Sequence, residues 1–257
     1  SQRVVPNLLF TSGTTGRPKA VQLPPKTIGD SPDLAGFVAH ITAHRLAELG
    51  PHLVVGPLYH NGPLTAVRLM LAGVPIVVHE RFDAEATLAA IAEHGVESSI
   101  MVPTHFVRCL ALAPEVRARY DVSSLRQVAH TGGRCPIDVK RSMIEWWGPV
   151  LSESYGGTES GTVCSVNSTD WLAHPGSVGR AVPPFESLVL DDHGNELPAN
   201  TEGRPAQPQC EVRPRCAGRV HQELAPAARD PGRNDLPADL ADRRGRHGDG
   251  GDGDLGA

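Results

Sequence analysis

The sequence predicts an α/β fold, a layered α/β sheet core with a small β-rich subdomain. Two observations support this prediction. Short apolar runs recur up to about residue 204, and segments with apolar residues at helical spacing lie between several of them. Strands that alternate with helices in this way are typical of parallel β-α-β units. Ligands bind at the carboxyl ends of the strands in such sheets, so functional residues are expected in the loops that follow strands.

The apolar runs are predicted as strands and the periodic segments as helices. The first strand, Leu8-Leu9-Phe10, stops at a loop of Thr, Ser and Gly, so it is expected to be buried and to end at an active-site edge. The later strands are residues 53–58, 74–79, 99–102, 127–130, 150–154 and 187–190. The helices are residues 34–49, 63–71, 84–94, 105–113 and 137–147.

Changes in residue composition along the chain predict three parts. Residues 1–175 are predicted as a partial α/β core. Residues 176–204 are predicted as β-rich, because 188–198 reads as a strand, an Asp-His-Gly-Asn turn and a second short polar strand, the pattern of a β-hairpin. Residues 205–257 contain no Phe, Tyr, Trp, Ile, Met or Lys and are predicted to be disordered, because they cannot bury enough apolar surface. This tail is either a natural flexible segment or an out-of-frame translation of GC-rich DNA, and its Arg, Pro, Gly and Ala content favours the second.

The overall composition excludes several classes of protein. The 257-residue chain has a formal net charge of -5, which argues against non-specific binding of nucleic acid. Its five cysteines form no C-x-x-C pair, so no zinc site or disulfide framework is indicated and a cytoplasmic location is expected. No apolar stretch approaches transmembrane length. The N-terminus lacks both signal-peptide features and an initiator Met, so the chain is expected to begin within a longer protein. No feature predicts an oligomeric state.

The loop after the first strand has the composition of a phosphate-binding loop. Hydroxyl groups and unshielded backbone N–H groups come from six consecutive residues: Thr11, Ser12, Gly13, Thr14, Thr15 and Gly16. Arg17 and Lys19 add positive charge, and this combination suits a polyphosphate. The loop is not the common P-loop, because the glycine spacing differs and no Ser or Thr follows Lys19. A surface turn rich in small polar residues is the alternative.

Two further loops follow predicted strands and carry candidate residues. His60 follows the strand at 53–58 and is expected either to line a binding site or to make a structural hydrogen bond. Gly132 and Gly133 follow the strand at 127–130, where they either let a flat ligand approach the backbone or form a plain turn.

The loop at residues 155–159 combines groups suited to a magnesium nucleotide. The Tyr155 ring can stack on a base beside the flexible Gly156, the Thr158 hydroxyl can bond a phosphate oxygen, and the Glu159 carboxylate can hold Mg²⁺. A polar turn is the alternative. Because a basic phosphate loop and this loop occur in one predicted sheet, we expect them to converge as two halves of a Mg-nucleotide site.

Taken together, these motifs resemble those of the adenylate-forming (AMP-binding) superfamily, which includes acyl-CoA synthetases, luciferases and peptide-synthetase adenylation domains. Thr-Ser-Gly-Thr-Thr-Gly-x-Pro-Lys stands at residues 11–19, with Ala20 where the family usually has Gly, and Tyr-Gly-x-Thr-Glu stands at 155–159. A Pro-x-aromatic-His element ends at His60, Gly132-Gly133 fits the adenine-binding loop, and Gly-Ser-Val-Gly-Arg at 176–180 matches the next block. The motifs occur in family order over residues 5–204.

The resemblance implies an incomplete N-terminal domain of the adenylate-forming fold and a two-step ligase reaction. A carboxylate attacks the α-phosphate of ATP to give acyl-AMP and pyrophosphate, and a thiol, usually coenzyme A, then displaces AMP. By this resemblance residues 11–19 hold the outer phosphates, Thr158 contacts the α-phosphate and the acyl carboxylate, and Glu159 binds Mg²⁺. Tyr155 packs on adenine and His60 lines the acyl pocket. The implied catalytic residues are Lys19, His60, Thr158 and Glu159.

The substrate class and the departures from the family follow from the same comparison. No acidic residue follows His60 in His-Asn-Gly-Pro-Leu, where amino-acid-activating members place an aspartate, so a synthetase for a fatty or other apolar acid is expected. The lid-domain lysine of the family has no counterpart, because no lysine follows Lys140. Asp254 matches the ribose-binding aspartate if the reading frame is restored near the end, and chance in a Gly/Asp-rich tail is the alternative. We therefore expect the family function with little turnover, or a non-catalytic remnant that at most binds nucleotide weakly.

Overall fold

The computed structural model describes residues 8–11, 19–22, 33–43, 45–158, 160–183, 185–186, 188–198, 201 and 204–206. All of them belong to one unit of the chain, Ser1–Glu223. The disorder predicted for residues 205–257 concerns a segment that lies almost wholly outside the described residues.

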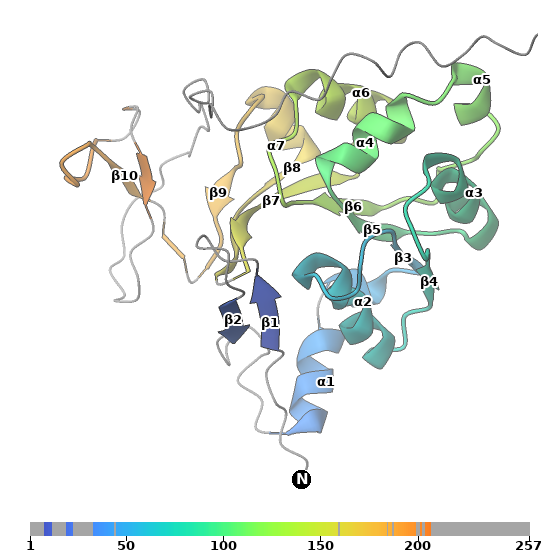
Figure 1. Cartoon of the computed structure of the whole chain (residues 1–257), viewed down its shortest axis with the longest axis horizontal. Coiled ribbons are helices and arrows are strands. Elements are labelled where there is room, and N and C mark those ends of the chain that lie inside the picture. Colours follow the sequence, from blue (N-terminus) through green and yellow to red (C-terminus); the bar gives the residue numbers. More distant parts are fainter. Residues whose placement is uncertain are drawn as a thin grey trace, which may run out of the picture. The chain divides into compact units, whose positions relative to one another are not determined.

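A seven-stranded sheet forms the centre of the described region, with the order β4-β3-β5-β6-β7-β8-β9 (Figure 1). Its parallel strands are β3 (His52–Val54), β4 (Ile76–Val78), β5 (Ser98–Met101), β6 (Gln127–His130) and β7 (Leu151–Gly157). The antiparallel strands β8 (Gly161–Asn167) and β9 (Arg180–Ala181) extend it. The structure confirms the α/β prediction, with a sheet that is mixed rather than purely parallel.

The strand order reverses next to β3, and this reversal places helices on both faces of the sheet. Helix α2 (Asn61–Leu71) leads from β3 outward to β4, whereas α3 (Ala84–His94) leads back past β3 to β5. Right-handed crossovers in opposite directions lie on opposite faces. The later helices α4 (Pro103–Leu110), α5 (Pro114–Arg117) and α6 (Ile137–Trp147) continue in the direction of α3. Figure 1 shows α4 and α6 across the sheet from α2.

The main hydrophobic core lies between the sheet and helices α3, α4 and α6. Leu53, Leu88, Phe106 and Met143 are completely buried in it. Phe106 packs edge-on against Trp147, with ring centroids 6.1 Å apart. Burial of such large apolar side chains is the main favourable term in folding, so this core fixes the strand ends in place.

Local sequence signals account for the helix ends that were predicted correctly. Helix α3 begins where the Asp83 carboxylate accepts a hydrogen bond from the Ala86 N–H, and it ends at Gly95 in the left-handed conformation. Helix α6 also matches its predicted bounds and ends before Gly148. The predicted helix at 34–49 is wrong in one respect, because α1 (Leu34–Thr42) is followed by a separate 3₁₀ turn at Arg45–Glu48.

Two hairpins lie outside the main sheet. Strand β1 (Leu8–Thr11) confirms the first predicted strand, and it pairs antiparallel with β2 (Lys19–Gln22). It is not uniformly buried as predicted, because Leu9 is buried while Phe10 is 68% exposed. Strand β10 (Leu188–Leu190) turns back after Asp191 as predicted, and the return arm meets it through the isolated bridge Leu190↔Glu196 and the hydrogen bond from the Leu197 N–H to the Val189 carbonyl. The ladder partner of β10 is instead β11 (Arg204–Ala206).

The buried His52 side chain predicts acid sensitivity of the fold. A hydrogen bond of 2.8 Å joins its Nδ1 to the Ser98 hydroxyl, and burial lowers the pKa of His52 to about 4. His52 is therefore protonated below about pH 6.5 in the unfolded chain but stays neutral in the folded chain until the pH approaches 4. The stability present above pH 6.5 is lost as the pH falls through this range. We expect this residue to contribute a loss on the order of 3 kcal/mol in the free energy of unfolding.

Urea unfolding at neutral and acidic pH measures this effect. His52→Gln keeps a hydrogen-bonding group beside Ser98 but cannot be protonated, so its stability should depend less steeply on pH than that of the unmodified chain. An equal slope in both proteins would contradict the assignment.

Candidate functional site

The candidate site is built at the edge of the sheet where the parallel strands end. Register pairs Val54 of β3 with Ile100 of β5, Met101 of β5 with His130 of β6, and His130 with Glu153 of β7. The segments that follow these strands therefore leave from one edge. Adjacent strands lie about 4.8 Å apart, so the segment that follows β6 starts beside Glu153 of β7, whereas the segment that follows β3 starts about two strand spacings from β6. Strand β7 runs four residues beyond Glu153, to Gly157.

His60 lies on this edge at the start of α2. Its backbone is extended and its carbonyl accepts the first bond of the helix from Leu64. Within the described region the side chain makes no capping hydrogen bond, and it is exposed beside the Tyr59 ring, with centroids 4.7 Å apart. The structure therefore gives no support to a structural hydrogen bond, and the imidazole is free to face a ligand.

The two glycines after β6 differ in what the fold requires of them. Gly132 has a φ of 81°, a conformation that side chains other than glycine rarely adopt, so the turn itself explains it. Gly133 has an ordinary φ, and a Cβ added there would meet no described heavy atom within 4 Å. The turn alternative thus accounts for Gly132 but not for Gly133, which leaves open space above the backbone.

The candidate loop after β7 is part of a strand hairpin. Strand β7 continues three residues past its predicted end and pairs with β8 through Gly157, with a register shift between Tyr155 and Gly156. A Cβ on Gly156 would lie 1.8 Å from the Gly161 carbonyl oxygen, so the close approach of β8 requires glycine there. Tyr155 is half-buried against Val163, Cys164 and Val178. Thr158 lies in the turn, and Glu159 lies outside the described residues.

The predicted phosphate loop connects the strands of the β1–β2 hairpin. These two strands form a sheet of their own, so the prediction that this loop and the loop at 155–159 occur in one sheet is wrong. Thr11 and Lys19 are directly opposite each other in this pairing, so the structure brings the two ends of the loop together. The Lys19 side chain is exposed and Thr11 is half-buried. The residues between them lie outside the described residues: Ser12, Gly13, Thr14, Thr15, Gly16, Arg17 and Pro18. Asp254 does as well.

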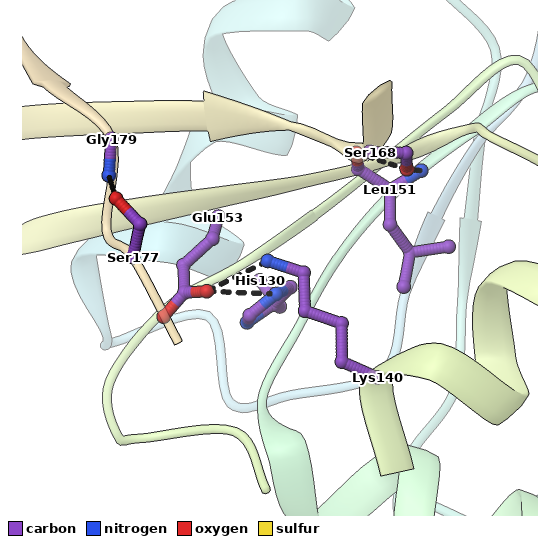
Figure 2. Close-up of polar contacts among 7 residues, drawn as sticks. All are labelled: His130, Lys140, Leu151, Glu153, Ser168, Ser177 and Gly179. Atoms are coloured by element: carbon purple, nitrogen blue, oxygen red, sulfur yellow. Dashed lines mark hydrogen bonds and ion pairs between the residues drawn. The ribbon is translucent and has the colours of Figure 1, made fainter. Parts of the chain in front are cut away.

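A buried polar cluster beneath the strand ends was not predicted from the sequence (Figure 2). The Lys140 ammonium lies 2.7 Å from Glu153 Oε2, and His130 Nε2 lies 3.7 Å from the same oxygen. Burial and the Lys140 charge lower the pKa of His130 to about 3, so its imidazole is neutral at physiological pH. Burial also lowers the pKa of Lys140, and the Glu153 carboxylate opposes this shift. The sequence does hold a signal, because Lys140 occupies a position on the apolar stripe of α6 that includes Ile144 and Trp147.

The described residues offer no metal centre of their own. They contain no group of three or more His, Cys, Asp or Glu side chains placed to hold a metal ion. Cys109, Cys135 and Cys164 are free and buried, and burial raises the pKa of Cys109 to about 12 and that of Cys135 to about 11. These thiols are therefore structural. In the same part of the chain, no helix combines the length and the apolar character needed to cross a membrane.

A family model described as AMP-binding enzyme matches residues 5–204. The chain belongs to the AMP-binding enzyme family. This confirms the resemblance read from the motifs, and the match ends where the composition of the chain changes. Members of the family include acid–thiol ligases of the acyl-CoA synthetase type.

Similar proteins support the family assignment and the fold. The human acyl-coenzyme A synthetase ACSM5, mitochondrial, is 32% identical over 215 residues, which are 79% of this chain and 35% of that protein. The ATP-bound MatB from Rhodopseudomonas palustris is 26% identical with a TM-score of 0.59, over 77% of this chain and 38% of that one. The amide bond synthetase McbA from Marinactinospora thermotolerans has the same fold, with 24% identity and a TM-score of 0.63 over 77% and 38% of the two chains. The chain thus spans about a third of the length of the curated relatives it matches.

The contrast between two glycines gives a test of the candidate site's geometry. Gly156→Ala places a Cβ against the β8 backbone, so the hairpin must shift, and we expect a loss of about 1–3 kcal/mol in the free energy of unfolding. Gly133→Ala is the matched control, because open space and an ordinary φ should hold its effect within about 0.5 kcal/mol. Urea denaturation measures both. Equal effects of the two variants would contradict the described geometry.

Proposed function

We propose that this chain carries the nucleotide site of an ATP-dependent acyl-CoA synthetase. The reaction activates a carboxylic acid as an acyl-adenylate and passes the acyl group to coenzyme A. The observation that carries the proposal is the shared edge of β6 and β7, where the loop that contains Gly133 begins beside Glu153, on the strand that runs on to the turn at Thr158. Members of the family bind ATP, Mg²⁺ and coenzyme A, which supports these as the ligands.

Each part of the proposed site has a distinct task. The open backbone at Gly132-Gly133 would receive the flat adenine, with the half-buried Tyr155 beside it. Thr158 would bond the α-phosphate and the acyl carboxylate. Glu159 would hold Mg²⁺, since carboxylate oxygens are the ligands this ion prefers. Lys19 would stabilise the outer phosphates as a cation at the end of the hairpin loop. Reactions of this type depend on positioning and charge neutralisation, which are the tasks proposed for these residues. Without a counterpart of the family's lid-domain lysine, we expect little turnover.

The acid that we propose as substrate is apolar, a fatty acid or a similar acyl compound. His60 and the exposed Tyr59 mark the start of α2 at the site edge, and no acidic side chain stands among residues 60–64 to pair with a substrate amine. An apolar acid needs no such partner. We propose no nucleic-acid partner. We keep the cytoplasm as the proposed location, which rests on the reduced, buried cysteines.

The reaction itself can be tested by acid-dependent exchange of labelled pyrophosphate into ATP. The purified chain is incubated with Mg·ATP, labelled pyrophosphate and a series of carboxylic acids of increasing chain length. Exchange that requires an apolar acid supports the proposed activity. Calorimetric binding of Mg·ATP without exchange would support the alternative, a non-catalytic remnant that at most binds nucleotide weakly. Absence of both would contradict the proposal.

The role of Lys19 can be tested by comparing two nucleotides. Lys19→Met should weaken ATP binding by about 10–100-fold, because one charge-assisted hydrogen bond to the outer phosphates is lost. AMP lacks those phosphates, so its affinity should change little. The side chain is exposed, and the fold should therefore be unaffected.

Arg126→Met is the matched control for the loss of one positive charge. Arg126 is exposed and precedes β6 at the amino end of the strand, away from the site edge. Isothermal titration calorimetry with both ligands measures the effects. Equal losses of ATP and AMP affinity in Lys19→Met, or an equal loss in Arg126→Met, would contradict the assignment.

A further inference from the structure

Two buried side chains, His130 and Lys140, lie close to one carboxylate oxygen of the buried Glu153, and the three residues belong to three different elements. His130 ends β6, Lys140 lies in the first turns of α6, and Glu153 lies in β7. His130 and Lys140 have no exposed surface, and Glu153 is 8% exposed. The Lys140 ammonium lies 2.7 Å from Glu153 Oε2, and the neutral His130 imidazole lies 3.7 Å from the same oxygen (Figure 2).

The order of these residues along the chain links the cluster to the candidate site. The loop at residues 131–136 connects β6 to α6, so His130 lies at its start and Lys140 lies just beyond its end. Both ends of this loop therefore face Glu153, which is paired with His130 and stands two residues before Tyr155. A single carboxylate thus connects the loop that contains Gly132-Gly133 to the strand that leads into the turn at Thr158.

Stabilisation of the fold does not by itself account for the buried Lys140–Glu153 ion pair. Replacing a buried ion pair with apolar residues of similar size is often neutral or stabilising, because burial costs each charge its hydration. The Lys140 ammonium also lies over the buried Trp171 ring, 4.7 Å from its centroid, and this cation–π contact offsets part of the cost. The ion pair does supply direction, since an ammonium and a carboxylate at hydrogen-bond distance fix the spacing of α6 and β7.

His130 limits the space around this pair. A separation of 3.7 Å from Glu153 Oε2 is too long for a hydrogen bond, and neither ring nitrogen has a hydrogen-bond partner among the described residues. The ring packs edge-on against Phe106 with centroids 5.4 Å apart. The ring therefore packs beside the Glu153 carboxylate and limits its movement, while Lys140 donates the hydrogen bond to it.

We propose that Glu153 and Lys140 are positioning residues of the nucleotide site. Their ion pair holds the loop at 131–136 against β7, so that the backbone at Gly133 and the turn at Thr158 keep a fixed spacing for one nucleotide. The ligand in this inference rests on the proposed function, whereas the ordering of the two loops does not.

The test variant is Lys140→Met combined with Glu153→Gln, which removes both charges and retains the side-chain lengths. Amide hydrogen exchange of residues 131–135 and 155–158 should be faster on the order of tenfold, while exchange in β5 and α3 stays unchanged. The dissociation constant for Mg·ATP should rise about 10–100-fold, because displacement of positioned groups by about 1 Å costs this much. Glu153→Gln alone leaves the Lys140 ammonium buried without its partner and should give a larger effect on the loops.

Ser98→Ala is the matched control. It breaks the buried His52–Ser98 hydrogen bond in the same sheet, but at the amino ends of the strands. It should lower the melting temperature without changing loop exchange or the ATP dissociation constant. The positioning role is overturned if the double variant shows unchanged loop exchange, or if it loses protection throughout β5 and α3. If the unmodified chain binds no Mg·ATP, the proposed function fails, and the exchange data still decide whether the ion pair orders the loops.

Discussion

The parallel backbone pairing of β5, β6 and β7 is the constraint on which the rest of the structure depends. Side chains alternate between the two faces of a strand, so Leu151, Glu153 and Tyr155 share one face of β7. Leu151 is buried in the main core, Glu153 meets Lys140, and Tyr155 packs on a smaller apolar cluster. A slip of one residue would move all three to the other face. The same register that builds the core therefore sets the buried carboxylate and the candidate site above it.

The antiparallel strands β8 and β9 extend this arrangement by covering the side of the sheet beyond β7. Gly156 allows the β8 backbone to approach closely, and the register shift beside it re-aims the end of β7. Because β8 is hydrogen-bonded along β7, the turn at Thr158 is held at both ends by a ladder rather than left as a free loop. A loop anchored in this way needs little further ordering when it binds a ligand.

The sequence predicted the fold best where local signals and tertiary packing agree. Helix α3 has an Asp N-cap and a left-handed Gly, and both of its ends were placed correctly. Strand β8 was missed, because its polar residues break the alternation expected of a half-buried strand and its pairing with β7 comes from tertiary structure. The end of β7 was also missed, since Gly156-Gly157 is typical of a turn and only the β8 ladder makes it a strand. The strand-end loops were found from the sequence, but the Lys140–Glu153 pair was not, because it depends on strand register.

The groups beneath the strand ends are fixed in place, whereas those above them are exposed. Beneath them, a buried ion pair and a close backbone contact at Gly156 fix the positions of the two loops. Above them, Gly133 is exposed, with no described heavy atom within 4 Å of an added Cβ, and His60 is exposed on the same edge. A rigid base under an open surface is the arrangement in which binding energy is not spent on ordering the protein. It suits a reaction such as adenylate formation, in which the protein acts mainly by holding phosphates and a carboxylate in line.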